Sequence, residues 1–231
     1  MISAIITAYN SERYLSEAID SALGQTLPPD EILIIDDGST DGTRGVAESY
    51  GEPVRYCWQR NQGPGGARML GIRESKGDVL VFLDADDLWM PEKVARQSAA
   101  LDEDPDLDIV FNHLVQFRSP DLSPEVAATL ICDETPHPAP LISGMMARRR
   151  AFDRVGPLRT DLKAEFVDWY MRAQEAGIKS LTLDEVLHKR RLHPDNFTLQ
   201  NKDVRREYLQ VIKAALDRRR AAERRQDGSA S

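Results

Sequence analysis

The sequence predicts an α/β fold: a mostly parallel, Rossmann-like sheet flanked by helices and followed by a C-terminal helix. Short apolar runs alternate with segments of helical periodicity through residue 87, which is typical of a parallel sheet covered on both faces. Residues 31–36 and 79–84 are apolar at consecutive positions, as expected of strands that are buried on both sides. Polar residues follow three of these runs and mark the strand ends as candidate functional positions.

The first half is expected to alternate strictly between strand and helix. An apolar stripe at helical spacing follows Asn10 and Ser11, either of which can cap the first helix, and Pro28 ends it. A turn rich in glycine and aspartate precedes the second helix, and a glycine-rich loop precedes the third. The expected strands are residues 2–7, 31–36, 54–58 and 79–84, and the expected helices are residues 14–23, 46–50 and 67–75.

The second half is expected to be less regular. Pro91 is well placed to begin a helix that runs to about residue 101, before a strand at 107–117. Residues 119–140 contain five prolines and are predicted to form a long loop with a helical piece at 125–130. The remaining expected elements are helices at 148–155 and 166–176, a strand at 180–191 and an amphipathic helix with a frayed tail within 201–231.

Charge and cysteine content limit the classes of partner. The formal net charge of −8 argues against a nucleic-acid partner. Residues 202–225 are locally basic, with nine Lys/Arg against four Asp/Glu; we expect a solvated helix end, with weak contact to a membrane surface or an acidic partner as the alternative. Two distant cysteines cannot form a disulfide framework, and neither a signal peptide nor a membrane-spanning run is recognisable, so we expect a cytoplasmic location.

A pair of carboxylates after the fourth strand is the strongest functional signal. In an extended backbone, residues two apart point the same way, so Asp84 and Asp86 can converge on one point. Hard oxygen donors suit Mg²⁺ or Mn²⁺, and such an ion commonly shares its coordination shell with phosphate. Asp87 is expected to cap the helix that begins near Pro91.

Three motifs together resemble those of family 2 glycosyltransferases. They are Ser3-Ala4-Ile5-Ile6-Thr7-Ala8-Tyr9-Asn10, Ile34-Ile35-Asp36-Asp37-Gly38-Ser39-Thr40-Asp41-Gly42-Thr43 and Gly77-Asp78-Val79-Leu80-Val81-Phe82-Leu83-Asp84-Ala85-Asp86-Asp87. The resemblance covers roughly residues 1–200 and implies a GT-A fold, with a nucleotide-sugar-binding half (1–101) and an acceptor-binding half (102–200). It implies a metal-dependent, inverting transfer of a sugar from a nucleoside-diphosphate sugar, expected to be a UDP-sugar, to an unidentified acceptor hydroxyl.

The resemblance also assigns residues to the site. The family's nucleotide-sugar-binding positions correspond here to Thr7, Ala8, Tyr9, Asp37, Arg68, Asp84, Ala85 and Asp86. Among them Asp37 matches the carboxylate that recognises the base, and Asp86 matches the more direct metal ligand. His193 resembles the late histidine that often completes the metal shell, with Arg190 or Arg191 expected beside the diphosphate.

The acceptor base stays open between Glu165 and Asp168. Relatives often carry Glu-Asp, an aromatic residue and a second Asp, whereas here Phe166 occupies the usual Asp position. Glu165 and Asp168 lie three residues apart and would share one face of a helix.

Two other functions remain as alternatives. A nucleotidyltransferase acting on sugar phosphates also uses an α/β sheet and a metal-bound diphosphate, but the segment 7–10 lacks the glycines expected of its activating loop. A non-catalytic nucleotide-sugar-binding module would keep the fold without transfer, since a fold does not determine function.

Overall fold

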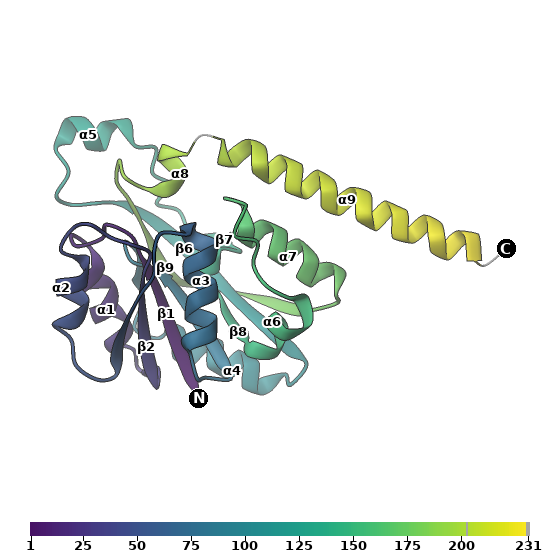
Figure 1. Ribbon diagram of the computed structural model, residues 1–231, viewed down its shortest axis with the longest axis horizontal. Coiled ribbons are helices and arrows are strands. Elements are labelled where there is room, and N and C mark those ends of the chain that lie inside the picture. Colours follow the sequence, from purple (N-terminus) through teal and green to yellow (C-terminus); the bar gives the residue numbers. More distant parts are fainter. Residues whose placement is uncertain (202, 230–231) are drawn as a thin grey trace.

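The computed structural model describes residues 1–201 and 203–229, and these residues form a mixed sheet with helices on both faces (Figure 1). The strands are β1 (Ile2–Ala8), β2 (Glu31–Asp36), β3 (Val54–Trp58), β4 (Val79–Asp84), β5 (Leu88–Trp89), β6 (Leu107–Arg118), β7 (His137–Ala139), β8 (Met146–Arg148) and β9 (Lys179–Leu192). The α-helices are α1 (Leu15–Leu23), α2 (Thr43–Glu48), α3 (Gly63–Glu74), α4 (Lys93–Glu103), α5 (Pro124–Thr129), α6 (Arg149–Val155), α7 (Glu165–Glu175), α8 (Phe197–Gln200) and α9 (Val204–Ser229), with a 3₁₀ turn η1 at Ile142–Gly144.

The sheet has the order β3-β2-β1-β4-β8-β6-β9-β5, and β7 pairs with β6. The first four strands are parallel, and Thr7 pairs with Asp84 while Ala8 pairs with Asp36. The carboxyl ends of β1, β2 and β4 are therefore level with one another. The polar residues that follow these strands lie along one edge of the sheet, as the sequence predicted.

Strand β8 is the main element that the sequence did not reveal. It consists of Met146–Arg148 and lies antiparallel between β4 and β6. Three residues are too few to show a period of two, and the apolar segment before them reads equally well as a loop. Because β8 opposes both neighbours, β4 and β6 run in the same direction on either side of it.

Two apolar layers enclose the sheet. Side chains of β1, β2 and β4 alternate between the two faces, as the pleat requires. One face packs against α1, α2 and α4, and the other packs against α3, α6 and α7. Both faces are buried, which explains the uninterrupted apolar runs of the parallel strands.

Helix α9 lies beside α7 and then extends beyond the rest of the molecule (Figure 1). Val204, Val211 and Ala215 are buried on the inner face, whereas Leu209 and Leu216 are exposed. The helix reaches Ser229. Residues 202, 230 and 231 of the predicted C-terminal segment lie outside the described residues. Within those described, no helix is both long and apolar enough to cross a bilayer.

Candidate functional site

The site is built on the carboxyl ends of β1 and β4. Thr7 Oγ1 donates to Asp84 Oδ1 at 3.4 Å, so the two paired strand ends also share a side-chain contact. Ala8 and Ala85 are buried, and Tyr9 beside them is 53% exposed. The exposed phenol ring leaves an aromatic surface open at the edge where the sequence placed the nucleotide.

Arg68 joins Asp84 at the end of β4 to Glu165 on α7. It lies on α3, where its guanidinium donates to Asp84 Oδ1 at 2.9 Å and also to Glu165 Oε1. Burial alone would lower the pKa of Arg68, but the charges of Asp84 and Glu165 raise it above its usual value. Arg68 is therefore a permanently charged link between β4 and α7.

Asp86 and His193 meet, although they lie 107 residues apart. The Nε2 atom of His193 is 2.9 Å from Asp86 Oδ2, and Asn196 Nδ2 donates to the same oxygen at 2.9 Å. Burial opposes ionisation of Asp86, yet the contacts with His193 and Asn196 lower its pKa overall. The predicted pairing of Asp86 with His193 is present, whereas Asn196 is a neighbour that the sequence did not indicate.

Asp87 does not cap a helix, which corrects the sequence-based expectation. Its Oδ1 accepts from the backbone N–H of Arg191 at 2.9 Å, and its Oδ2 lies 2.9 Å from His188 Nε2. Helix α4 begins at Lys93 with no side-chain cap. Burial raises the pKa of Asp87 to about 6, although His188 opposes this shift. Asp87 thus fastens β9 beside Asp86, which a local capping pattern cannot reveal.

Arg191 also differs from its expected role beside a diphosphate. Its guanidinium is buried against the rings of Tyr14 and Phe117, and the Cζ atom lies 4.8 Å from the centre of each ring. It donates to Glu17 Oε2 at 2.8 Å and to the carbonyl of Asp86 at 2.9 Å. The Arg191 guanidinium is therefore engaged by protein groups that hold β9 against the site.

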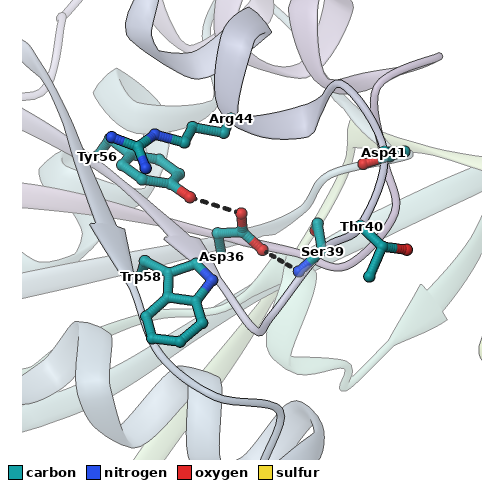
Figure 2. A pocket seen from close by; sticks show the side chains of 7 residues that line it. All are labelled: Asp36, Ser39, Thr40, Asp41, Arg44, Tyr56 and Trp58. Atoms are coloured by element: carbon teal, nitrogen blue, oxygen red, sulfur yellow. Dashed lines mark hydrogen bonds between the residues drawn. The ribbon is translucent and has the colours of Figure 1, made fainter.

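Asp37 is buried and holds the loop that precedes α3. Its Oδ1 accepts from Gln59 Nε2 at 2.6 Å and from the Gln62 N–H at 2.9 Å, while Oδ2 accepts from the Gly63 N–H at 2.8 Å. Asp36 faces the other side of the sheet and lines the hollow in Figure 2. The adjacent carboxylates of Asp36 and Asp37 therefore lie in different places, one in the hollow and the other at the start of α3.

The two candidate bases lie in different environments. Glu165 contacts Arg68, and burial raises its carboxyl pKa although Arg68 opposes the shift. Asp168 accepts instead from Arg172 Nε at 2.9 Å, one turn along the same helix. Phe166 belongs to the apolar layer with Trp169 and brings no polar group to the site. Only Glu165 of these residues has a contact with the network around Asp84.

The geometry of Asp86 and His193 suits a divalent cation. The 2.9 Å between Asp86 Oδ2 and His193 Nε2 is a hydrogen-bond distance, and it is also compatible with the spacing of about 3.0 Å between neighbouring ligands of an octahedral ion bound at about 2.1 Å. Among the described residues, no cluster of three or more His, Cys, Asp or Glu side chains surrounds a single point. An ion held here would therefore take its other ligands from a bound molecule or from water.

Comparison with solved structures establishes the fold class. The structure aligns with TarS residues 1–349 from S. aureus in complex with UDP at a TM-score of 0.68 and 20% identity, covering 93% of this chain and 64% of TarS 1–349. It aligns with the mannosyltransferase PcManGT from Pyrobaculum calidifontis, in complex with GDP-Man and Mn²⁺, at a TM-score of 0.69 and 20% identity, covering 94% of this chain and 64% of the other. The fold is that of the GT-A glycosyltransferases.

Sequence comparison then gives the family. Residues 3–155 match the model of glycosyl transferase family 2, and the chain belongs to that family. A Nostoc protein described as an uncharacterized glycosyltransferase is 35% identical over an alignment of 214 residues, and the match covers 84% of this chain and 66% of the relative. A Rickettsia typhi protein with the same description is 40% identical over 110 residues, or 48% of this chain and 35% of the relative. The chain thus spans less than two thirds of the length of these relatives.

Proposed function

We propose that the chain is a metal-dependent, inverting glycosyltransferase that moves a sugar from a nucleoside-diphosphate sugar to an acceptor hydroxyl. The observation that carries this proposal is the meeting of Asp86 with His193 beside Asp84, at the carboxyl edge of the parallel strands. Ligands of open α/β sheets bind at this edge. Family membership supports the same chemistry.

Charge balance supports a role for Mn²⁺ or Mg²⁺. Asp84 and Glu165 place two carboxylates around the single guanidinium of Arg68, Asp86 follows two residues after Asp84, and a diphosphate would add further negative charge. A bound divalent ion supplies the positive charge that stabilises a departing diphosphate. The imidazole of His193 favours Mn²⁺ over Mg²⁺, which prefers an all-oxygen shell. The Mn²⁺ in the PcManGT structure agrees with that preference.

The donor is proposed to lie along Thr7, Ala8 and Tyr9, with its diphosphate toward Asp86. Asp37 Oδ2 takes one hydrogen bond, from Gly63, and keeps a lone pair for an N–H of the base. A UDP-sugar is favoured because TarS was solved with UDP and with UDP-GlcNAc, although PcManGT binds GDP-Man.

Glu165 is proposed as the base that takes the proton of the acceptor hydroxyl. A carboxylate with a raised pKa is a better proton acceptor, and burial raises the pKa of Glu165. Glu165 Oε1 is engaged by Arg68, so the proton would go to Oε2. Attack from the side of the sugar opposite the diphosphate inverts the anomeric carbon.

Asp86→Ala tests the cation site. The variant should lose Mn²⁺-dependent affinity for UDP because one of the two protein ligands is removed, and calorimetry with and without EDTA measures this. Asp78→Ala is the matched control, because it removes an exposed carboxylate just before β4, at the opposite end of that strand from Asp84. Unchanged Mn²⁺-dependent affinity in Asp86→Ala would rule out the assignment.

Glu165→Gln and Asp168→Asn test the base. Donor affinity should survive in both, while release of sugar from a panel of nucleotide sugars in the presence of acceptor or water should collapse in Glu165→Gln alone. Near-normal turnover in Glu165→Gln would reject Glu165 as the base.

A second candidate function is a nucleotide-sugar-binding module without transfer. The buried Phe166 at the position where relatives carry a carboxylate favours it. Wild-type protein that binds donor with Mn²⁺ but never releases nucleoside diphosphate would select this candidate over the enzyme.

A further inference from the structure

A hollow of about 440 Å³ lies at the edge strand β3. Its walls come from the ends of β2 and β3, the turn at 39–41 and the first turn of α2 (Figure 2). Tyr56 packs with the α1–α2 layer, whereas Cys57 packs with the α3 layer. Since side chains alternate along β3, Trp58 lies on the α1–α2 side of the sheet.

Trp58 is the aromatic surface of this hollow. Its side chain is 59% exposed, whereas Trp89 and Trp169 are 4% and 0% exposed. Single exposed apolar residues are common on soluble proteins and alone mean little. Here, however, the indole stands beside hydrogen-bonding groups in a concave surface, which is the composition of a small-molecule site.

The charged groups of the hollow are already compensated. Asp36 accepts from the Ser39 N–H at 2.8 Å and from the Tyr56 hydroxyl at 2.7 Å. Burial and the contact with Asp36 raise the pKa of Tyr56, so its hydroxyl stays protonated as a donor. The Arg44 guanidinium lies 5.7 Å from the Tyr56 ring centre and donates to Glu48. A cationic ligand would bind over the face of the Tyr56 ring, but the positively charged Arg44 already occupies that position. The hollow therefore suits a neutral ligand.

The hollow adjoins the base end of the proposed donor site, since Asp36 pairs with Ala8, but it opens on the other face of the sheet. Trp58 pairs with Asp36, Asp36 with Ala8, and the neighbouring Thr7 with Asp84. Three strand spacings of about 4.8 Å place Trp58 roughly 14 Å from Asp84 along the sheet. The face also differs, because Asp37 turns toward the loop before α3 while Asp36 turns into the hollow.

We infer that this hollow is a binding subsite for a neutral saccharide, held with one pyranose face on the Trp58 indole. The C–H face of a pyranose is apolar and packs on an aromatic plane, while its hydroxyls need donors and acceptors around the rim. Arg44 and Asp41 supply the rim groups. The inference rests on the proposed function for one point: the natural occupant is a saccharide portion of the acceptor, remote from the reacting hydroxyl.

The tryptophan content gives a direct assay. Because Trp58 is the exposed member of the three tryptophans, fluorescence emission and acrylamide quenching report on the hollow. Titration with tetrasaccharides of β-1,4-linked glucose, of N-acetylglucosamine and of mannose should shift the emission to shorter wavelength and protect it from acrylamide for at least one of them. Calorimetry should show about tenfold weaker saccharide binding in Trp58→Ala and a smaller loss in Arg44→Ala.

Two controls separate this subsite from the proposed catalytic function. Leu181→Ala removes an exposed apolar side chain near the start of β9 and should bind saccharide as the wild type does. Mn²⁺-dependent affinity for UDP should be unchanged in Trp58→Ala, so loss of saccharide binding with intact donor binding supports the subsite. The inference is overturned if no tetrasaccharide moves the emission, if Trp58→Ala binds saccharide normally, or if uridine protects Trp58 as well as a saccharide does.

Discussion

Replacing Arg68 by Met should cost about 3 kcal/mol of the free energy of unfolding at pH 7.5. Removing one partner of a buried ion pair typically costs about 3–5 kcal/mol, because it leaves a buried charge without compensation. The Glu165 side chain is 4% exposed, so it falls in that class, and it takes a hydrogen bond from Arg68. The Asp84 side chain is 36% exposed, and water screens its share to less than about 1 kcal/mol. Met retains most of the apolar stem and limits the cavity.

A double-mutant cycle isolates the pair. In the Glu165→Gln background the buried negative charge is absent, so Arg68→Met should cost about 2 kcal/mol less than it does in the wild type. Urea unfolding followed by circular dichroism measures each free energy by linear extrapolation. Arg44→Met is the matched control, because its pair with Glu48 is exposed and should contribute less than about 0.5 kcal/mol.

The pH dependence gives an independent check. Burial raises the pKa of Glu165 in the folded protein, so between its ordinary and folded values the folded state binds more protons and stability increases as the pH falls. Arg68→Met removes the charge that opposes this shift, so its deficit should shrink as the pH is lowered from 7.5 toward 5. A deficit below about 1 kcal/mol at pH 7.5, or no recovery in the Glu165→Gln background, would refute the reasoning.

Two further predictions concern the core. A Cβ at Gly71 would clash with Ile5 Cγ2, so Gly71→Ala should destabilise the protein by about 1–3 kcal/mol. A Cβ at Gly45 meets no atom within 4 Å, so Gly45→Ala should stabilise the protein by about 0.5–1 kcal/mol. Equal effects of the two variants in urea unfolding would contradict this. Burial lowers the pKa of Lys93 well below its usual value, so the unfolded state binds more protons and wild-type stability should rise as the pH increases from 7 toward 10. Lys93→Met should flatten that rise, and an unchanged slope would show that Lys93 is not its source.

The sequence was most informative for the parallel strands, which are visible as apolar runs, and for the polar residues that follow them. The run 79–84 forms β4 and ends in Asp84, as the pattern indicated. The convergence of Asp84 and Asp86 on one ion stays a prediction, because Asp84 contacts Arg68 whereas Asp86 contacts His193. Burial on both faces made the parallel strands visible as uninterrupted apolar runs. The GT-A fold and the family are confirmed by the comparisons.

Long-range contacts set the limit of sequence-based prediction. His193 was predicted to join Asp86 through family resemblance, since no local rule connects residues 107 apart. Asp87 was assigned to a helix cap because Pro91 is near in sequence, but the backbone of β9 competes for the same carboxylate. The different surroundings of Glu165 and Asp168 depend on Arg68, which only tertiary packing brings to Glu165. Arg172, by contrast, lies one helical turn from Asp168 in the sequence.

The contacts of β9 constrain how its length can vary. His188, Arg191 and His193 meet Asp86 and Asp87 from fixed steps along one extended segment. A single inserted residue between Arg191 and His193 would turn the imidazole toward the opposite side of the chain. The segment 119–136 makes no such contact with Asp86 or Asp87. We therefore expect family members to accumulate insertions and deletions in that segment, while the spacing from 188 to 193 stays constant.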